Sequence, residues 1–102
     1  HIVQFYGVCL EPRFAIVTKY CAGGALDRRL YGPAADRNTP LSAALAHNLA
    51  RGVAFGVAHL HREGIVHGDI AARNVLLGPT LEALVCDFGL SHTGTGVNIE
   101  SE

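Results

Sequence analysis

The spacing of apolar residues predicts one long helix in the middle of the chain. Between about residue 42 and residue 62, apolar side chains recur every three or four positions, which places them on one face of a helix. Thr39-Pro40 or Ser42 supplies a start signal for this helix, and Gly64 supplies a stop signal. The expected stripe consists of Leu49, Val53, Val57 and Leu60, broadened by Ala46, Ala50 and Ala54.

Shorter elements are expected before this helix. The chain begins on what looks like a strand, and residues 27–31 are a candidate for a short helix. Residues 32–40 are rich in glycine, proline, aspartate and asparagine, so we expect them to form a surface connection.

A hairpin is predicted after the helix. Residues 75–77 and 84–86 are short apolar runs, and the turn residues Gly78, Pro79 and Thr80 follow the first of them. A hairpin returns the chain to its starting level, so Asn74 and Asp87 are expected to face each other across its open end, about 5 Å apart.

The residues around this open end suggest a chemistry. An amide oxygen from Asn74 and a carboxylate from Asp87 are hard ligands that suit Mg²⁺, which takes one or two carboxylates together with substrate phosphates. Asp69 lies on a loop just before the hairpin and is left to accept a proton. One carboxylate for the nucleophile and an Asn/Asp pair for the metal are what phosphoryl transfer to a hydroxyl requires.

The chain resembles the eukaryotic protein kinases over essentially all 102 residues. The sequence HGDIAARN at residues 67–74 is similar to the catalytic loop of that family, and DFG at residues 87–89 is similar to its metal-binding motif. Residues 2–9 resemble the fourth strand of the family, and residues 14–20 resemble the fifth. AARN is the form typical of tyrosine kinases, and DFGLS agrees with that branch or with the tyrosine-kinase-like serine/threonine kinases.

The resemblance implies an α+β fold with two lobes. Residues 1–20 would be the end of the N-lobe sheet, residues 21–26 the hinge, and residues 27–102 the first part of the C-lobe. The glycine-rich loop, the phosphate-binding lysine and the helix-C glutamate of the family would all precede His1, so we expect an internal piece of a kinase domain that neither folds stably nor transfers phosphate alone.

The resemblance also implies binding and catalytic roles. The backbone of Lys19 and Cys21 would contact the adenine of ATP, Leu76 would form the floor of the slot, and Thr18 would guard its back. Gly24, beside Gly23, belongs to a hinge without bulky side chains, although a glycine pair is also common in ordinary turns. Asp69 would be the catalytic base, Arg73 would orient it with the phenolic hydroxyl, and Asn74 and Asp87 would hold Mg²⁺. His67 would be a core histidine that braces the loop and packs near Phe88.

Composition excludes some classes of function but indicates no particular one. The chain is 49% hydrophobic and 17% charged with a net charge of −1, so nothing indicates a nucleic-acid partner. No stretch approaches the length of a membrane span, and whether the parent protein is attached to a membrane stays open. The three cysteines form no CxxC pair and are expected to be free thiols of a cytoplasmic kinase domain, Cys86 as a small buried residue or as a border of the nucleotide pocket.

Two features could mislead. His59 and His61 resemble a metal pair, but ligands on one helical face need a spacing of three or four, so we expect packing or solvent histidines. Gly68 stands where most protein kinases carry arginine, which removes the partner of an activation-segment phosphate.

Gly68 also leaves alternatives open. Small-molecule kinases of the aminoglycoside and choline type share the spacing of His67, Asp69 and Asn74, and a non-catalytic pseudokinase scaffold is a third class. The expectation is an ATP- and Mg²⁺-dependent kinase that acts on protein substrates. Tyrosine is the expected acceptor, and serine or threonine is the nearest alternative.

Overall fold

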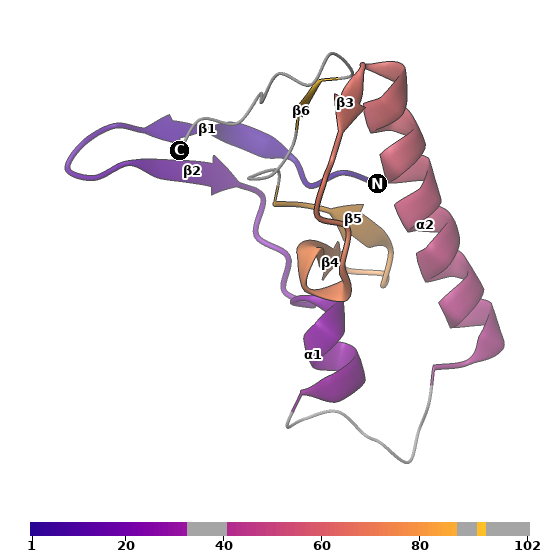
Figure 1. Cartoon of the computed structure of the whole chain (residues 1–102). Coiled ribbons are helices and arrows are strands. Elements are labelled where there is room, and N and C mark those ends of the chain that lie inside the picture. The colour runs from indigo at the N-terminus through magenta and orange to yellow at the C-terminus, as the bar shows by residue number, and fades with distance from the viewer. Residues whose placement is uncertain (33–40, 88–91, 94–102) are drawn as a thin grey trace.

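The computed structural model describes residues 1–32, 41–87 and 92–93. They form a small α+β structure in which a hairpin lies between a long helix on one side and a second, projecting hairpin on the other (Figure 1). The helices are α1 (Leu26–Tyr31) and α2 (Ala43–Arg62), with a 3-10 turn at Ala72–Asn74. The strands are β1 (Phe5–Cys9), β2 (Ala15–Thr18), β3 (Ile65–Val66), β4 (Val75–Leu77), β5 (Ala83–Val85) and β6 (His92–Thr93).

Helix α2 begins and ends where the sequence predicts. The hydroxyl of Ser42 accepts a hydrogen bond from the backbone N–H of Leu45 at 3.1 Å and so caps the first turn. Gly64 follows the helix with a φ of +76°, a conformation that favours glycine, and its N–H donates to the carbonyl of His61. The candidate helix at residues 27–31 is also confirmed as α1.

The stripe that α2 buries differs from the expected one. Leu49 and Leu60 are buried as expected, but the expectation for Ala46, Ala50 and Ala54 is wrong, since all three are exposed. The other buried residues of the helix are Gly52 and Gly56. The buried face is therefore turned toward the two glycines, where the lack of a side chain lets the backbone of the helix approach its neighbours.

The β4–β5 hairpin carries the core. It is antiparallel, with Val75 opposite Val85 and Leu77 opposite Ala83, and these four side chains are buried. Alternate residues point to opposite faces of a hairpin. Val75, Leu77 and Ala83 pack with Leu49 of α2. Leu76 and Leu84 lie on the other, half-exposed face.

Two further segments extend this hairpin on both sides. The chain at His1–Val3 runs beside β5, with hydrogen bonds from Val85 to His1 and from Val3 to Val85. On the other side, Ala25 pairs with Leu76 beside β4. The first strand is thus shorter than expected, because residues 2 and 3 pair with β5 and only Phe5–Cys9 pairs with β2.

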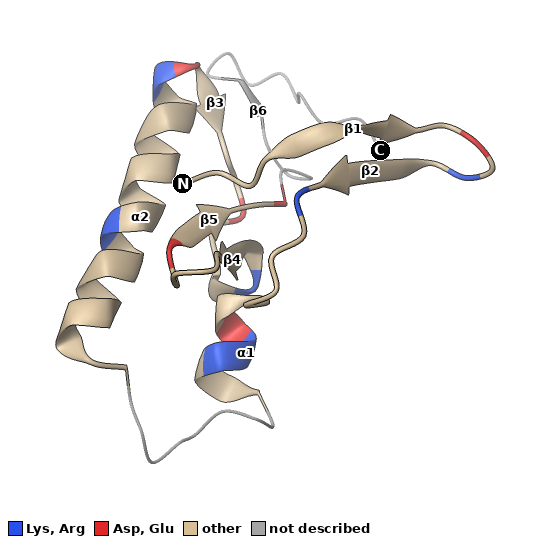
Figure 2. Cartoon of the chain, turned by 180° about the vertical axis from the view of Figure 1, so that it is seen from behind, with Lys and Arg blue, Asp and Glu red and all other residues tan. Residues whose placement is uncertain are grey.

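The β1–β2 hairpin extends away from this core (Figure 1). Every residue of β2 is exposed, and β3 pairs with the short β6. Charged residues are scattered over the ribbon rather than gathered on one element (Figure 2). No helix in the described ranges combines the length and apolarity that crossing a membrane requires.

Candidate functional site

The loop between α2 and β4 is organised by one buried histidine. Nδ1 of His67 accepts a hydrogen bond from the backbone N–H of Asp69 at 3.0 Å, so the ring hydrogen belongs on Nε2. Nε2 lies 2.8 Å from the carbonyl of Cys86 and donates to it. With 2% of its surface exposed, His67 ties the loop to the end of β5, as the sequence predicts for a bracing core histidine.

Gly68 allows the sharp turn of this loop. Its φ of +86° lies in the left-handed region, where a residue with a Cβ atom is strained by about 1–2 kcal/mol. The glycine that replaces the usual arginine therefore also suits the backbone at this position.

The carboxylate of Asp69 is held on both of its oxygens. Nη2 of Arg73 donates to Oδ1 at 2.6 Å, and Nδ2 of Asn74 donates to Oδ2 at 3.0 Å and to the backbone carbonyl of Asp69 at 2.8 Å. Arg73 and Asn74 lie four and five residues after Asp69, and both belong to the short 3-10 turn that brings their side chains to its carboxylate. Because the Arg73 side chain is 60% exposed, the ion pair adds less than about 1 kcal/mol of stability, and its main effect is orientation.

The amide of Asn74 has its donor side committed to Asp69. Its Oδ1 atom is therefore left to act as an oxygen ligand. The residue as a whole is buried, with 4% of its surface exposed. An amide oxygen fixed in this way is suited to a hard cation.

Asp87 lies at the end of β5, but not directly opposite Asn74. The N–H of Cys86 donates to the carbonyl of Asn74 at 2.9 Å, so the ladder that pairs Val75 with Val85 continues to Asn74 and Cys86. The expected pairing is wrong by one residue because the turn at residues 78–82 sets this register. Asp87 is exposed and takes a φ of +61°, a left-handed conformation that aspartate tolerates better than most residues.

Cys86 borders this end of the hairpin. Burial, together with the neighbouring charge of Asp87, raises the pKa of its thiol. Cys9, Cys21 and Cys86 are all free, as expected from the absence of a CxxC pair.

The segment from Thr18 to Ala25 connects β2 to α1 and passes beside β4. Gly24 takes a φ of +70°, and its N–H donates to the carbonyl of Cys21 while its own carbonyl accepts from Leu77 at 2.8 Å. The Sγ of Cys21 lies 3.9 Å from the carbonyl of Lys19, a weak contact. Gly24 and Leu76 are thus brought together, since Leu76 pairs with the adjacent Ala25.

Gly23, expected with Gly24 in a hinge without bulky side chains or in an ordinary turn, also has a packing role. A Cβ atom at this position would lie 2.7 Å from the carbonyl oxygen of Leu77 and 2.8 Å from its Cβ atom. The residue must therefore be glycine for the segment to lie against β4, and the Gly-Gly pair was the visible signal.

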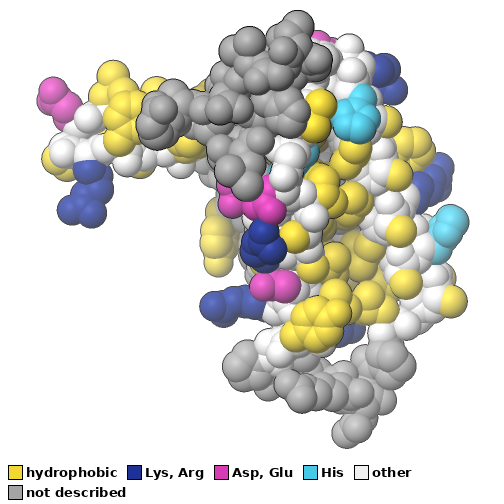
Figure 3. All heavy atoms as spheres, in the orientation of Figure 1, with side chains coloured by type: hydrophobic (Ala, Val, Ile, Leu, Met, Phe, Trp, Pro, Cys, Tyr) yellow, Lys and Arg dark blue, Asp and Glu magenta, His cyan; other side chains and the backbone are white. Residues whose placement is uncertain are grey.

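Figure 3 shows acidic and basic side chains adjoining one another on the face between the β1–β2 hairpin and α1. The motif residues Phe88 and Gly89 lie outside the described residues. Within the described ranges, no three His, Cys, Asp or Glu side chains form a group that could hold a metal ion. Asn74 and Asp87 alone supply few oxygen ligands. They therefore suit a Mg²⁺ site in which the phosphate oxygens of a bound substrate supply further ligands.

Comparison with known proteins identifies the family of the chain. Residues 1–100 match the family described as protein tyrosine and serine/threonine kinase. The chain is 39% identical over 95 residues to a probable leucine-rich repeat receptor-like serine/threonine-protein kinase of Arabidopsis thaliana, and these cover 89% of this chain and 9% of that protein. It is 35% identical over 101 residues to stress-activated protein kinase alpha of Dictyostelium discoideum, which covers 99% of this chain and 16% of the relative.

A third relative is the BDNF/NT-3 growth factors receptor of Gallus gallus, 36% identical over 100 residues, with 89% of this chain and 12% of the receptor covered. The chain therefore spans less than a fifth of the length of these three relatives. On the match over residues 1–100 and these relatives, the chain belongs to the protein tyrosine and serine/threonine kinase family.

Proposed function

We propose that the protein containing this chain transfers the γ-phosphoryl group of ATP to hydroxyl groups of proteins, with Asp69 as the catalytic base. The observation that carries the proposal is the carboxylate of Asp69, which Arg73 and Asn74 hold by one oxygen each at 2.6 and 3.0 Å. A carboxylate fixed in this way, 27% exposed at the mouth of a loop, can accept the proton of an incoming hydroxyl.

The Asn74 and Asp87 side chains would hold Mg²⁺. Asn74 directs Nδ2 to Asp69 and so offers Oδ1, and Asp87 adds an exposed carboxylate from the end of β5. The ion would neutralise charge on the phosphates during transfer.

The nucleotide would lie between the Thr18–Gly24 segment and the half-exposed face of the β4–β5 hairpin. In this proposal the carbonyl of Lys19 and the N–H of Cys21 contact the adenine, Leu76 forms the floor, and Thr18 guards the back. The support is that Gly24 lies beside β4, where its carbonyl accepts from Leu77 at 2.8 Å.

Tyrosine is the proposed acceptor, because Arg73 reaches the carboxylate of Asp69 from the loop form typical of tyrosine kinases. A serine/threonine preference is the second candidate, and the name of the Arabidopsis relative favours it. Family membership favours a protein acceptor over an aminoglycoside or choline.

We assign residues 1–20 to the end of an N-lobe sheet, residues 21–26 to the hinge and residues 27–102 to the C-lobe, in a kinase domain located in the cytoplasm. The support is that residues 21–25 connect β2 to α1 and touch β4, as a hinge between two lobes would. With Gly68 in place of arginine, phosphorylation of the activation segment would not gain an arginine contact at this loop.

The test is a transfer assay with the full-length protein and labelled Mg·ATP. The acceptors are three peptides that differ only in carrying tyrosine, serine or threonine, together with choline and an aminoglycoside. We expect label on the tyrosine peptide. Label only on serine and threonine would select the second candidate, and label only on the small molecules would contradict the proposal of a protein acceptor.

The variant Asp69→Asn separates an active kinase from a scaffold. Transfer should fall by a factor of about 10²–10⁴ while nucleotide affinity changes little, because Asp69 faces the hydroxyl rather than ATP. Asp87→Asn should also weaken Mg·ATP binding. An equal loss of ATP affinity in both variants would count against these roles, and no transfer by the unaltered protein would favour the scaffold.

A further inference from the structure

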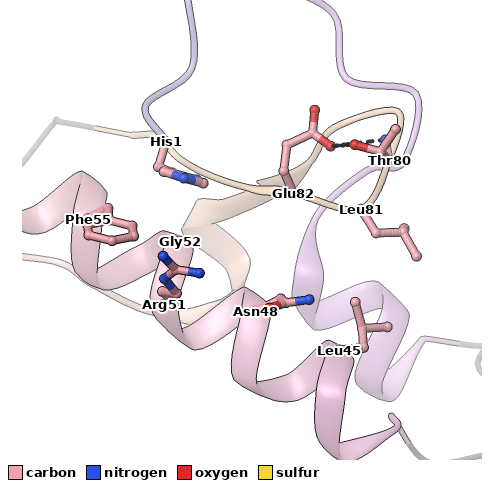
Figure 4. Close-up of a pocket in the computed structure, with 9 residues that line it drawn as sticks. All are labelled: His1, Leu45, Asn48, Arg51, Gly52, Phe55, Thr80, Leu81 and Glu82. Carbon is pink, nitrogen blue, oxygen red and sulfur yellow. Dashed lines mark hydrogen bonds between the residues drawn. The ribbon is translucent and has the colours of Figure 1, made fainter.

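A groove runs along α2 on a part of the molecule that the proposed function does not use. Two adjoining cavities of about 370 and 360 Å³ share His1 and Phe55. The first is bounded by α2 and by the turn of the β4–β5 hairpin, and Figure 4 shows its side chains on these two elements and on the first residue of the chain. Neither cavity is lined by Asp69, Asn74 or Asp87.

Successive turns of α2 supply one wall of the groove. The spacing from Leu45 to Asn48, Gly52, Phe55, His59 and Arg62 follows the helical repeat, so these residues share one face. The glycine at position 52 keeps this wall low, since a Cβ atom there would lie 2.9 Å from Nδ1 of His1. The groove is thus a consequence of the same close approach that packs the helix against the start of the chain.

The floor of the groove is apolar and partly aromatic. Phe55 is 50% exposed, and its ring stacks on the His1 ring with a centroid separation of 5.8 Å. Leu81, 43% exposed at a φ of +64°, stands at the other end, on the hairpin turn. A half-exposed phenylalanine and leucine at the two ends of a cavity provide a place for an apolar side chain.

The rim of the groove is basic. The guanidinium of Arg51 lies 5.1 Å from the centre of the Phe55 ring, and Arg62 lines the far end. Among the described residues, neither arginine lies within ion-pair distance of a carboxylate.

The acidic residue of the lining is already engaged. Oε2 of Glu82 accepts from the N–H of Thr80 at 3.0 Å and from its hydroxyl, and the hydroxyl bond lowers the pKa of this carboxyl. Glu82 therefore stays a carboxylate held at its own turn, and Arg51 and Arg62 outnumber this one negative charge along the groove.

We infer that this groove is a docking site for an acidic, apolar peptide segment of a partner protein. Arg51 and Arg62 are eleven residues apart, which is about 16 Å along a helix and corresponds to about five residues of extended peptide. A segment with carboxylates at that separation and leucine-sized side chains between them pairs both arginines and covers Phe55. Charge complementarity selects acidic over basic partners.

The first cavity of the groove lies at the turn of the β4–β5 hairpin, and the proposed active site lies at the open end of the hairpin. Three residues of strand, about 10 Å, separate the two. A docked partner therefore leaves the proposed site accessible, so this inference goes beyond the proposed activity and does not depend on it.

The experiment uses the full-length protein and a fluorescein-labelled heptapeptide with two glutamates at each end and leucine, serine and leucine between them. We expect saturable binding by fluorescence anisotropy that weakens as salt rises. Arg51→Glu should raise the Kd about tenfold or more, and Phe55→Ser about fivefold or more, since both remove contacts at the centre of the groove. Arg28→Glu, a matched charge reversal on the exposed side of α1, should change the Kd less than twofold.

Peptide variants and a labelling probe complete the test. The peptide with lysines for glutamates, and the one with serines for leucines, should not bind. A cysteine introduced by Asn48→Cys should react with a maleimide in the free protein and be protected by the peptide, as read by peptide mapping.

Other outcomes would overturn the inference. Equal binding by Arg51→Glu would place the peptide elsewhere, and an unreactive Cys at position 48 in the free protein would mean that flanking sequence already covers the groove. A concentration-dependent dimer that Arg51→Glu dissolves would assign the groove to a second copy of the chain.

Discussion

At the scale of single residues, the geometry of the candidate site depends on His67. One imidazole accepts from the backbone of Asp69 and donates to the carbonyl of Cys86, so the loop that carries the proposed base and the segment that carries Asp87 are joined through a single ring. The motif in the sequence predicts a bracing role for this histidine, but only the structure shows that Cys86 is its partner.

Replacing His67 with alanine should therefore cost both stability and turnover. The change removes two hydrogen bonds and a side chain that is 2% exposed, so we expect about 2–4 kcal/mol lower free energy of unfolding by urea denaturation. The kcat of the full-length protein should fall more than its KM for ATP changes. His47→Ala, on the exposed side of α2, is the control and should stay within about 0.5 kcal/mol. Equal effects of the two substitutions would show that His67 is not a brace.

The thiol of Cys86 provides a pH test of the same region. Burial raises its pKa, so the reactive thiolate forms at higher pH than in an exposed thiol, and the rate of iodoacetamide labelling should reach its midpoint above the value of about 8.5 of a free cysteine. Peptide mapping separates Cys86 from Cys9 and Cys21. Protection by Mg·ADP would support a nucleotide beside Cys86, and labelling at the midpoint of a free cysteine would contradict the burial.

At the scale of elements, the sequence pattern predicts the helices and turns that local interactions determine. It misses the packing that contacts between distant segments determine. The hairpin, α1 and both ends of α2 follow from turn residues, a cap and the three-to-four spacing. The direction of the buried stripe of α2 does not, because a glycine in a helix gives no apolar signal. Gly56 is buried in close contact with its neighbours, since a Cβ atom there would lie 2.7 Å from the carbonyl oxygen of His1 and 3.0 Å from Cγ2 of Val85.

Gly56→Ala tests this contact, because helix propensity and packing predict opposite changes in the free energy of unfolding. Helix propensity alone would stabilise the protein by about 1 kcal/mol, whereas the added methyl group pushes on the backbone at His1 and should destabilise it by about 1–3 kcal/mol. The free energy of unfolding decides between these outcomes. Ala50→Gly, on the exposed face, is the reference for propensity and should cost about 1 kcal/mol without a packing term. A more stable Gly56→Ala variant would mean that the helix can shift away at little cost.

At the scale of the whole molecule, the core lies between α2 and the β4–β5 hairpin, and the β1–β2 hairpin lies outside it. Large apolar side chains are open to solvent on the outer hairpin and just after it, including Phe14, 76% exposed, and Tyr20, 87% exposed. A two-stranded hairpin is marginally stable in water without further strands or a helix to cover it. In the two-lobed fold expected from the sequence, a neighbouring sheet would cover these side chains, and this covering remains a proposal.

The last prediction concerns the 102 residues on their own. Because the apolar face of the β1–β2 hairpin is uncovered, we expect the isolated chain to bind a hydrophobic dye, to self-associate and to unfold without a sharp transition. Sedimentation, dye fluorescence and thermal circular dichroism measure these properties. The double change Phe5→Ser and Phe14→Ser should lower dye binding, whereas Ala46→Ser and Ala54→Ser on the exposed side of α2 should not. A monomer that melts cooperatively and binds no dye would show that the core formed by α2 and β4–β5 is sufficient, and that the exposed hairpin is tolerated without a partner.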